Sequence, residues 1–237
     1  MADGPKFLPA GESGLLVELG DAIDPALNAL VHRLDGLIGQ ARLAGVIETV
    51  PTYRSLLVVF DPLATESARL EDSVRALWPR AQASEAGGQG RRWFVPVAFG
   101  GELGMDLDDV ARRTGLSAAE VVARHEATDY IVYMLGFAPG FAYLGTLDEK
   151  LRLPRRETPR LAVPPGAIMQ GGAQACVSTL EMPSGWHVLG RTPSPIYDPG
   201  RERPFLLAPG DRVRFVSIPA GEFENRAKAL PDSEALA

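Results

Sequence analysis

The sequence is poor in the residues that most often hold metals and disulfides. It has a single cysteine, Cys176, which excludes an internal disulfide and is typical of a reducing compartment. Its three histidines, His32, His125 and His187, lie far apart in the sequence. There are no paired cysteines and no His-Glu-x-x-His motif, so we expect no metal site. A glycine-rich loop ending in Lys-Ser or Lys-Thr is also absent, which argues against a nucleotide site of the P-loop type.

Long hydrophobic runs and an excess of positive charge are absent as well. The opening segment, MADGPKFLPAGESG, has no apolar stretch behind its charges and does not resemble a signal peptide. No later run is long enough to span a bilayer. The net charge of −6 argues against a broad surface for nucleic acid. We therefore expect a cytoplasmic protein that binds neither nucleic acid nor membrane.

Glycine and proline are plentiful, at 25 and 20 of 237 residues, which favours tight turns over long helices. In the first third, apolar patterns predict a strand, a helix, two strands and a second helix that stops at Pro79. The expected ranges are 14–19, 24–38, 46–50, 55–60 and 66–78. This order is most of a split βαβ pattern, so residues 1–84 are expected to form a small ferredoxin-like α+β domain.

The rest of the chain has a different pattern. Residues 85–90 are expected to be a flexible linker, and residues 91–237 a mainly β domain that starts with a strand at 93–99. Two short helices follow, the second opened by a capping box of Ser117 and Glu120. From residue 130 onward, short apolar runs are punctuated by glycine and proline, as in a closed or nearly closed β-barrel. A late strand is expected at 211–218, and the tail 227–237 is expected to be frayed.

Candidate functional residues are dense between residues 136 and 198. Phe137, Phe141 and Tyr143 are framed by glycines around Pro139. Such a segment can hold aromatic faces around a pocket, while the glycines let main-chain amides approach a ligand. The alternative is a turn whose aromatic side chains pack into the core, which is their more common use.

Arginines follow this aromatic segment. Arg160 lies in a proline-rich stretch, and an arginine on restrained backbone is suited to a carboxylate. It belongs to a local cluster that is equally typical of a solvated loop. The other members of the cluster are Arg152, Arg155 and Arg156.

Further polar groups come next. Gly171, Gly172 and Gln174 could address a carbonyl oxygen, as an oxyanion site requires. Another glycine turn carries three candidate residues: Trp186, Arg191 and Thr192. Cys176 lies nearby, but no sequence pattern links it to a histidine, so we expect it to pack rather than to act as a nucleophile. His125, near the end of a predicted helix, is explained by contact with the helix dipole.

Taken in order, five segments resemble one known family. They are VPTYRSLLVVFDP (50–62), YMLGFAPGFAYLGTLDEKLRLPRRETPR (133–160), VPPG (163–166), GWHVLGRTP (185–193) and PFLLAPGDRVRF (204–215). Such a series is far more specific than any single motif. Over nearly its whole length the chain is similar to allophanate hydrolase subunit 1, also called PxpB or KipI, and to the corresponding part of the carboxyltransferase region of urea carboxylase.

This resemblance implies a fold and partners. It implies an N-terminal α/β domain and a C-terminal cyclophilin-like β-barrel. Members of the family pair with a second cyclophilin-like subunit, allophanate hydrolase subunit 2 or PxpC. In bacterial 5-oxoprolinase a third protein, PxpA, joins them to open pyroglutamate to glutamate at the expense of ATP. The chain would then be inactive alone, with ATP bound by or shared with another subunit.

The chain departs from the family pattern at residues 166–180, GAIMQGGAQACVSTL, where relatives read like GSVGIAGxQTGIYP. Gln174 is kept, whereas Ala175 and Cys176 replace Thr-Gly. If this segment lines the pocket, the substrate could differ from pyroglutamate.

Three functions follow from the resemblance: a 5-oxoprolinase subunit, a carboxyltransferase or allophanate hydrolase component of urea or amide metabolism, and a non-enzymatic inhibitor of a histidine kinase. For the first, side-chain chemistry gives a hypothesis in which Arg160 and Arg191 hold a carboxylate and Gln174 addresses the lactam carbonyl. Phe137 and Phe141 would then wall the ring. Four more residues complete the expected binding site: Pro139, Tyr143, Trp186 and Thr192.

Overall fold

The computed structural model describes residues 4–83, 90–227 and 229–236. The chain divides into two compact units, Met1–Gly88 and Gln89–Ala237. Of the linker predicted at 85–90, residues 85–89 lie outside the described residues. None of the helices in the described ranges combines the length and the apolar character that a membrane span requires.

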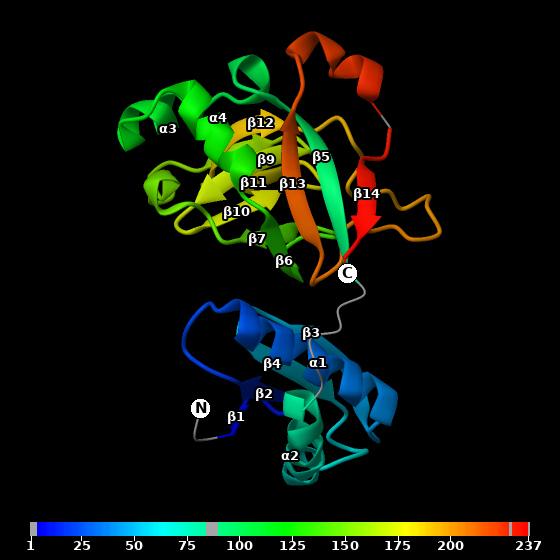
Figure 1. Cartoon of the computed structure of the whole chain (residues 1–237). Coiled ribbons are helices and arrows are strands. Elements are labelled where there is room, and N and C mark those ends of the chain that lie inside the picture. The colour runs from blue at the N-terminus through cyan, green and yellow to red at the C-terminus, as the bar shows by residue number, and fades with distance from the viewer. Residues whose placement is uncertain (1–3, 84–89, 228, 237) are drawn as a thin grey trace. The chain divides into compact units, whose positions relative to one another are not determined.

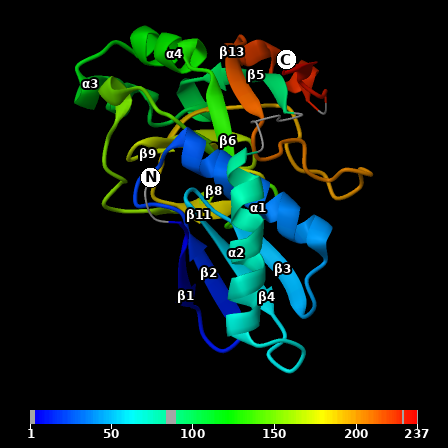
Figure 2. The ribbon, with the colours of Figure 1, turned by 60° about the horizontal axis from the view of Figure 1, so that its bottom comes forward.

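The first unit is one antiparallel sheet with two helices on one of its faces (Figures 1 and 2). The strand order is β1-β2-β4-β3, and α1 and α2 lie side by side. The bounds are β1 (Lys6–Pro9), β2 (Gly14–Glu18), α1 (Pro25–Ala41), β3 (Val46–Pro51), β4 (Ser55–Phe60) and α2 (Ser67–Ala83). Alternate residues of β2 and β4 and one stripe of each helix form the buried core.

The predicted order of strand, helix, two strands and helix is confirmed, and β1 completes the sheet. In a ferredoxin-like fold a fourth strand pairs with the first strand of the pattern. Here β1, which precedes the pattern, pairs with β2 from Lys6↔Glu18 to Pro9↔Leu15. The segment KFLP is too short to give a periodic signal, and its pairing with a distant edge is invisible in the local sequence.

The prediction that the second helix stops at Pro79 is wrong, because α2 continues to Ala83. Proline inside a helix removes one main-chain hydrogen bond and costs about 3 kcal/mol in an ordinary helix. Ala81 in the last turn is fully buried in the core of this unit. Tertiary burial of that turn therefore outweighs the local preference to end at Pro79.

The second unit is a closed β-barrel. Its sheet runs β12-β9-β10-β7-β6-β13-β5, and β12 also pairs with β5, which closes the ring. The strand bounds are β5 (Arg91–Phe99), β6 (Tyr130–Leu135), β7 (Ala142–Gly145), β9 (Ala167–Gly171), β10 (Gln174–Val177), β12 (His187–Arg191) and β13 (Arg212–Ser217). A separate strand pair consists of β8 (Arg160–Val163) and β11 (Met182–Ser184). The cyclophilin-like barrel expected from the sequence is confirmed.

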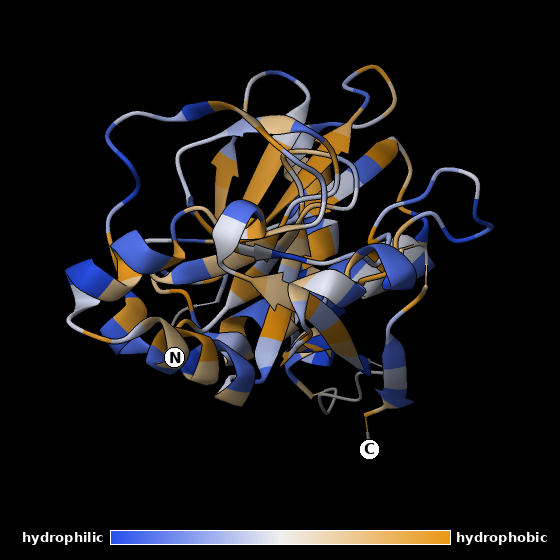
Figure 3. Ribbon diagram, turned by 90° about the horizontal axis from the view of Figure 1, so that it is seen from above, coloured by the Kyte–Doolittle hydropathy of each residue, from blue (hydrophilic) through white to orange (hydrophobic). Residues whose placement is uncertain are grey.

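Two helices accompany the barrel, α3 (Leu107–Thr114) and α4 (Ala118–Ala127). The Ser117 and Glu120 capping box that was predicted for α4 is present. Short 3-10 turns complete the unit at Gly101–Leu103, Glu149–Leu151, Ala220–Glu222 and Glu224–Arg226. The barrel strands are coloured mostly as hydrophobic in Figure 3, whereas the surrounding loops and helices carry many hydrophilic stretches.

The strands of the barrel bury residues on both faces. On β10, Ala175 and Val177 join the main core, while Cys176 points to the opposite face and joins a second cluster. Met182 of β11 and Val163 of β8 belong to this second cluster. The β8–β11 pair therefore covers one outer face of the barrel, and the functional site described below lies there.

The tail 227–237 was expected to be frayed, but part of it is a strand. β14 (Asp232–Ala235) pairs antiparallel with β5, from Asp232↔Phe94 to Ala235↔Arg91, and lies along its edge in Figure 1. Main-chain hydrogen bonds to an unpaired edge require no hydrophobic pattern, so composition alone could not predict this strand.

One buried polar chain crosses the barrel core. Tyr130 Oη lies 2.8 Å from His125 Nδ1, and His125 Nε2 lies 3.0 Å from Gln170 Oε1. Because Gln170 Nε2 donates to the Leu151 carbonyl at 2.6 Å, its Oε1 accepts from His125 Nε2. In the neutral ring, Nδ1 of His125 then accepts from the Tyr130 hydroxyl. Burial lowers the pKa of His125 to about 4. A neutral imidazole has no charge to interact with a helix dipole, so the dipole explanation of His125 is wrong.

Candidate functional site

A small pocket opens on the outer face that the β8–β11 pair covers. Its volume is about 140 Å³, and we call it the aromatic pocket. Its lining residues are Phe137, Phe141, Tyr143, Arg155, Met182, Pro183, Ser184, Gly185 and Trp186. Four of the residues expected from the sequence therefore lie together: Phe137, Phe141, Tyr143 and Trp186.

The aromatic side chains form a continuous edge-to-face series. The ring centroids of Phe137 and Phe141 are 5.7 Å apart, those of Phe141 and Tyr143 are 4.8 Å apart, and those of Tyr143 and Trp186 are 6.3 Å apart. The inner members are largely buried, whereas Phe137 at the end of the series is 70% exposed. Edge-to-face rings leave aromatic faces that suit a flat ligand.

Phe137 is held out by an unusual backbone conformation. Its φ is +69°, in the left-handed region that a bulky side chain rarely adopts. A short loop fixes it, since the Gly136 amide donates to the Phe141 carbonyl and the Phe141 amide donates to the Ala138 carbonyl. A strained backbone conformation lowers the stability of the folded state, and such residues cluster at functional sites.

Arg155 lies at the rim of the pocket. Its guanidinium carbon is 5.4 Å from the centre of the Trp186 ring, within cation–π range. The next residue along the chain, Arg156, donates its amide to the Gly185 carbonyl at 2.7 Å, which ties the arginine segment to the Trp186 turn. Arg155 is exposed and makes no ion pair with any described residue. Burial raises the pKa of Tyr143, so its phenol stays protonated beside this cation.

Asp106 anchors the same arginine segment from the barrel side. Its carboxylate accepts from Arg156 at 2.8 Å and from both terminal nitrogens of Arg160 at 2.7 Å, and its side chain is 3% exposed. The Val188 amide donates to it at 2.7 Å. Burial alone would raise the pKa of Asp106, but the Arg160 and Val188 hydrogen bonds and the two guanidinium charges hold it below its usual value.

A close backbone approach makes this anchor possible. A Cβ atom at Gly104 would lie only 1.9 Å from the Leu189 carbonyl oxygen. Glycine therefore allows the chain before α3 to lie directly against β12. The Asp106 amide consequently donates to the Val188 carbonyl, and the Asp106 carboxylate reaches the Val188 amide.

Gln174 lies on the same face of the sheet as the pocket. It is two residues from Cys176 on β10, and Cys176 packs with Phe141 and Trp186. It pairs with Gly171, where a Cβ atom would lie 3.1 Å from atoms of the Trp186 indole. Gln174 is thus beside the strand on which the indole rests, although it is not among the lining residues.

Cys176 is fully buried, and burial raises the pKa of its thiol well above the usual value. A thiol kept protonated in an apolar cluster is a poor nucleophile. Packing is therefore its role in this site, as the sequence indicated.

Other expected residues lie outside the aromatic pocket. Arg191, at the opposite end of β12 from Trp186, donates to the Pro165 carbonyl and stacks over Phe223. Thr192 is buried in a turn, where its hydroxyl accepts from the Ser194 amide. Pro139 is exposed in the aromatic loop, and its carbonyl accepts from Thr179.

Sequence reasoning missed two residues of this site, Asp106 and Arg155. Asp106 precedes a predicted helix in the run MDLDDV, where a helix cap is the obvious assignment, yet its side chain makes no capping hydrogen bond. Arg155 was one of four neighbouring arginines. Only the position of the buried carboxylate separates Arg156 and Arg160, which bind it, from Arg155, which does not.

The chain matches known proteins over most of its length. Residues 5–207 match the family model described as carboxyltransferase domain, subdomain C and D. The B subunit of 5-oxoprolinase from Bacillus subtilis is 36% identical over 217 residues, which cover 88% of this chain and 90% of that protein.

Solved structures show the same fold. The crystal structure of TTHA0988 is 36% identical with a TM-score of 0.77 over 86% of this chain, which spans 39% of that longer chain. The urea carboxylase of Kluyveromyces lactis is 21% identical with a TM-score of 0.76. It matches 98% of this chain, which covers 24% of the yeast protein. At that identity the likeness concerns the fold alone.

Proposed function

This chain belongs to the family of carboxyltransferase domains, subdomains C and D, and we propose that it is the B subunit of a 5-oxoprolinase that opens pyroglutamate to glutamate. The aromatic pocket with Arg155 at its rim carries the proposal. Pyroglutamate is a small flat ring with one carboxylate and one amide carbonyl. The pocket offers aromatic faces, one guanidinium and one phenol within a volume suited to such a ring.

The substrate would lie with its ring between Phe137, Phe141 and Trp186. Its carboxylate would bind Arg155, whose guanidinium is not engaged by a described carboxylate. Gln174 would address the lactam carbonyl from the neighbouring strand, as a preorganised donor does for developing negative charge.

Arg160, expected from the sequence to hold the substrate carboxylate, would act indirectly, without touching the substrate. Its two bonds to Asp106 occupy the fork of the guanidinium and fix the segment that carries Arg155. Pro139 would act similarly, because its carbonyl, held by Thr179, fastens the loop that presents Phe137.

A partner subunit would complete the site. Phe137, which lines the pocket, is exposed, so water would reach a reacting amide beside it unless another chain covered this residue. We expect an allophanate hydrolase subunit 2 or PxpC-like partner to cover the mouth, a PxpA-like third protein to join them, and ATP to be handled by the complex. The isolated chain would then be inactive. Its single cysteine suits a reducing cytoplasm.

A carboxyltransferase role is the second candidate, favoured by the description of the family model as a carboxyltransferase domain. The same pocket would then hold a urea-derived amide. The divergent segment 166–180 includes Cys176 in the wall behind the aromatic series, so it can tune which ring or amide fits.

Reconstitution with the PxpC-like partner and the PxpA-like protein tests the proposal. We expect glutamate to form from pyroglutamate and ATP, with little activity from the chain alone. Arg155→Ala should raise KM about tenfold or more through loss of a charged hydrogen bond. The matched control is Arg214→Ala, which removes an exposed arginine on β13. Turnover of urea with a biotin carboxylase, and none of pyroglutamate, would select the second candidate.

A further inference from the structure

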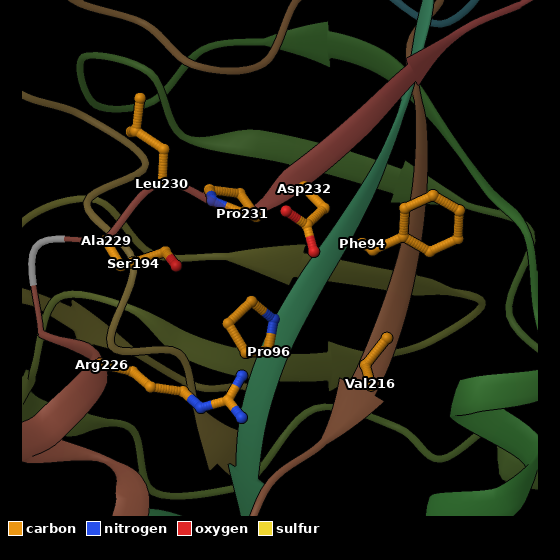
Figure 4. Close-up of a pocket in the computed structure, with 9 residues that line it drawn as sticks. All are labelled: Phe94, Pro96, Ser194, Val216, Arg226, Ala229, Leu230, Pro231 and Asp232. Carbon is orange, nitrogen blue, oxygen red and sulfur yellow. The ribbon is translucent and has the colours of Figure 1, made fainter.

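A second, larger pocket lies on the barrel away from the aromatic pocket. Its volume is about 240 Å³, and it is bounded by β5, β13, β14 and the segment leading into β14 (Figure 4). We call it the tail pocket. Its lining residues are Phe94, Pro96, Ser194, Val216, Arg226, Ala229, Leu230, Pro231 and Asp232. It shares no residue with the aromatic pocket.

Ser194 gives this pocket an unsatisfied polar group. The residue is 4% exposed, and its Oγ makes no hydrogen bond within the described part of the chain. Its amide is held by the Thr192 hydroxyl at 3.2 Å, which fixes the turn that carries it. A buried hydroxyl without a partner costs about 1–3 kcal/mol and is uncommon in a folded protein. Its presence on the wall of a cavity points to a polar ligand atom.

The pocket also carries one anion and one cation. The Asp232 carboxylate points into it in Figure 4 and has no ion pair or hydrogen bond among the described side chains. Arg226 enters from the opposite side and binds Glu222 through Nε and Nη2. Its Nη1 makes no hydrogen bond to a described residue. The pocket therefore offers a carboxylate, a guanidinium nitrogen and a hydroxyl.

Apolar side chains line the pocket between these polar groups. Phe94, Pro96, Val216, Leu230 and Pro231 supply the remaining walls. A ligand that satisfies all four features has an ammonium group for Asp232, a carboxylate for Arg226 and an aliphatic body for the walls. Its carboxylate can also accept from the Ser194 hydroxyl.

We propose that the tail pocket binds a zwitterionic α-amino acid with an aliphatic side chain. Neither an amine nor a carboxylate alone satisfies the pocket. An amine would leave the Ser194 hydroxyl and Nη1 of Arg226 without an acceptor, and a carboxylate would leave Asp232 without a cation. The proposal is independent of the reaction assigned to the aromatic pocket, since neither set of residues contributes to the other pocket.

Calorimetric titration of the full chain with L-leucine tests this site, with 3-methylbutylamine and 4-methylpentanoate as single-charge analogues. Leucine should bind, and each analogue should bind at least about tenfold more weakly. Asp232→Asn should weaken leucine binding about tenfold, while Glu224→Gln, a neighbouring carboxylate outside the pocket, should leave it unchanged. No binding of leucine at millimolar concentration, or equal binding of leucine and the amine, would overturn the proposal.

Ser194→Ala separates binding from folding. Because the Oγ has no partner in the described chain, its removal should leave the melting temperature unchanged or raised. Leucine affinity should nevertheless fall several-fold. A variant that melts lower and binds leucine as tightly as the wild type would show that the hydroxyl serves the fold instead of a ligand.

Discussion

Replacing Asp106 with asparagine removes the buried charge on which the arginine segment is anchored. Asp106 accepts four hydrogen bonds of 2.7–2.8 Å while its side chain is 3% exposed. Removing one member of a buried ion pair typically costs about 3–5 kcal/mol. Arg156 and Arg160 are 28% and 22% exposed, so water can partly resolvate them. We therefore expect a loss of about 2–4 kcal/mol in the free energy of unfolding.

Urea denaturation of the two proteins measures this loss as a shift in midpoint at constant slope. In a thermal scan it corresponds to a fall of roughly 5–15 °C for a chain of this size. Asp109→Asn is the matched control. Asp109 pairs with Arg112 and Arg113 on the surface of α3 and should change stability by less than about 1 kcal/mol. Equal stabilities of Asp106→Asn and the wild type would refute the view that this carboxylate anchors the segment.

Three further changes probe the core and the pocket. The pKa of His125 is about 4 in the fold and near 6.5 when unfolded, so the unfolded chain takes up a proton first as pH falls. The free energy of unfolding should be unaffected above pH 6.5 and should fall between pH 6.5 and 4, by about 2 kcal/mol at pH 5. Denaturation curves recorded over this pH range should show the fall in the wild type and not in His125→Gln. Phe137→Gly should leave the free energy of unfolding within about 1 kcal/mol of the wild type, because glycine adopts a left-handed backbone without strain. The same change should raise KM in the assembled enzyme, and unchanged kinetics would show that Phe137 does not belong to the site. Gly171→Val should displace the Trp186 indole, which steady-state fluorescence would detect as a shift in emission, and an unshifted spectrum would contradict the packing.

The sequence predicted those parts of the fold that local patterns determine. Helix α1 buries Leu30, Val31 and Leu34 at the spacing that the sequence indicated, and Asp24 caps it as such a residue should. The hairpin of β3 and β4 follows from two β-branched runs and a turn.

Elements that depend on distant partners escaped prediction. β1 and β14 are short edge strands with little hydrophobic pattern, and each forms because a neighbouring strand offers unpaired main-chain groups. Helix α2 passes Pro79 because Ala81 is buried by the rest of the unit. Local propensity cannot anticipate either effect, since both are set by contacts between segments far apart in the chain.

The site divides in the same way. The aromatic residues were predictable because Phe137, Phe141 and Tyr143 lie within one loop and one strand, close together in the sequence. The arginines were not, because their roles depend on Asp106, which lies 50 residues from Arg156 and 54 from Arg160. A carboxylate so distant in sequence has no local signal that links it to its partners.

The most direct test of the pocket assignment compares pyroglutamate with pyrrolidin-2-one, the same ring without its carboxylate, in the reconstituted enzyme. If Arg155 binds the carboxylate, the wild type should prefer pyroglutamate by about tenfold to a hundredfold in kcat/KM, and Arg155→Ala should lose most of that preference. An Arg155→Ala enzyme that still discriminates between the two lactams as strongly as the wild type would contradict the assignment.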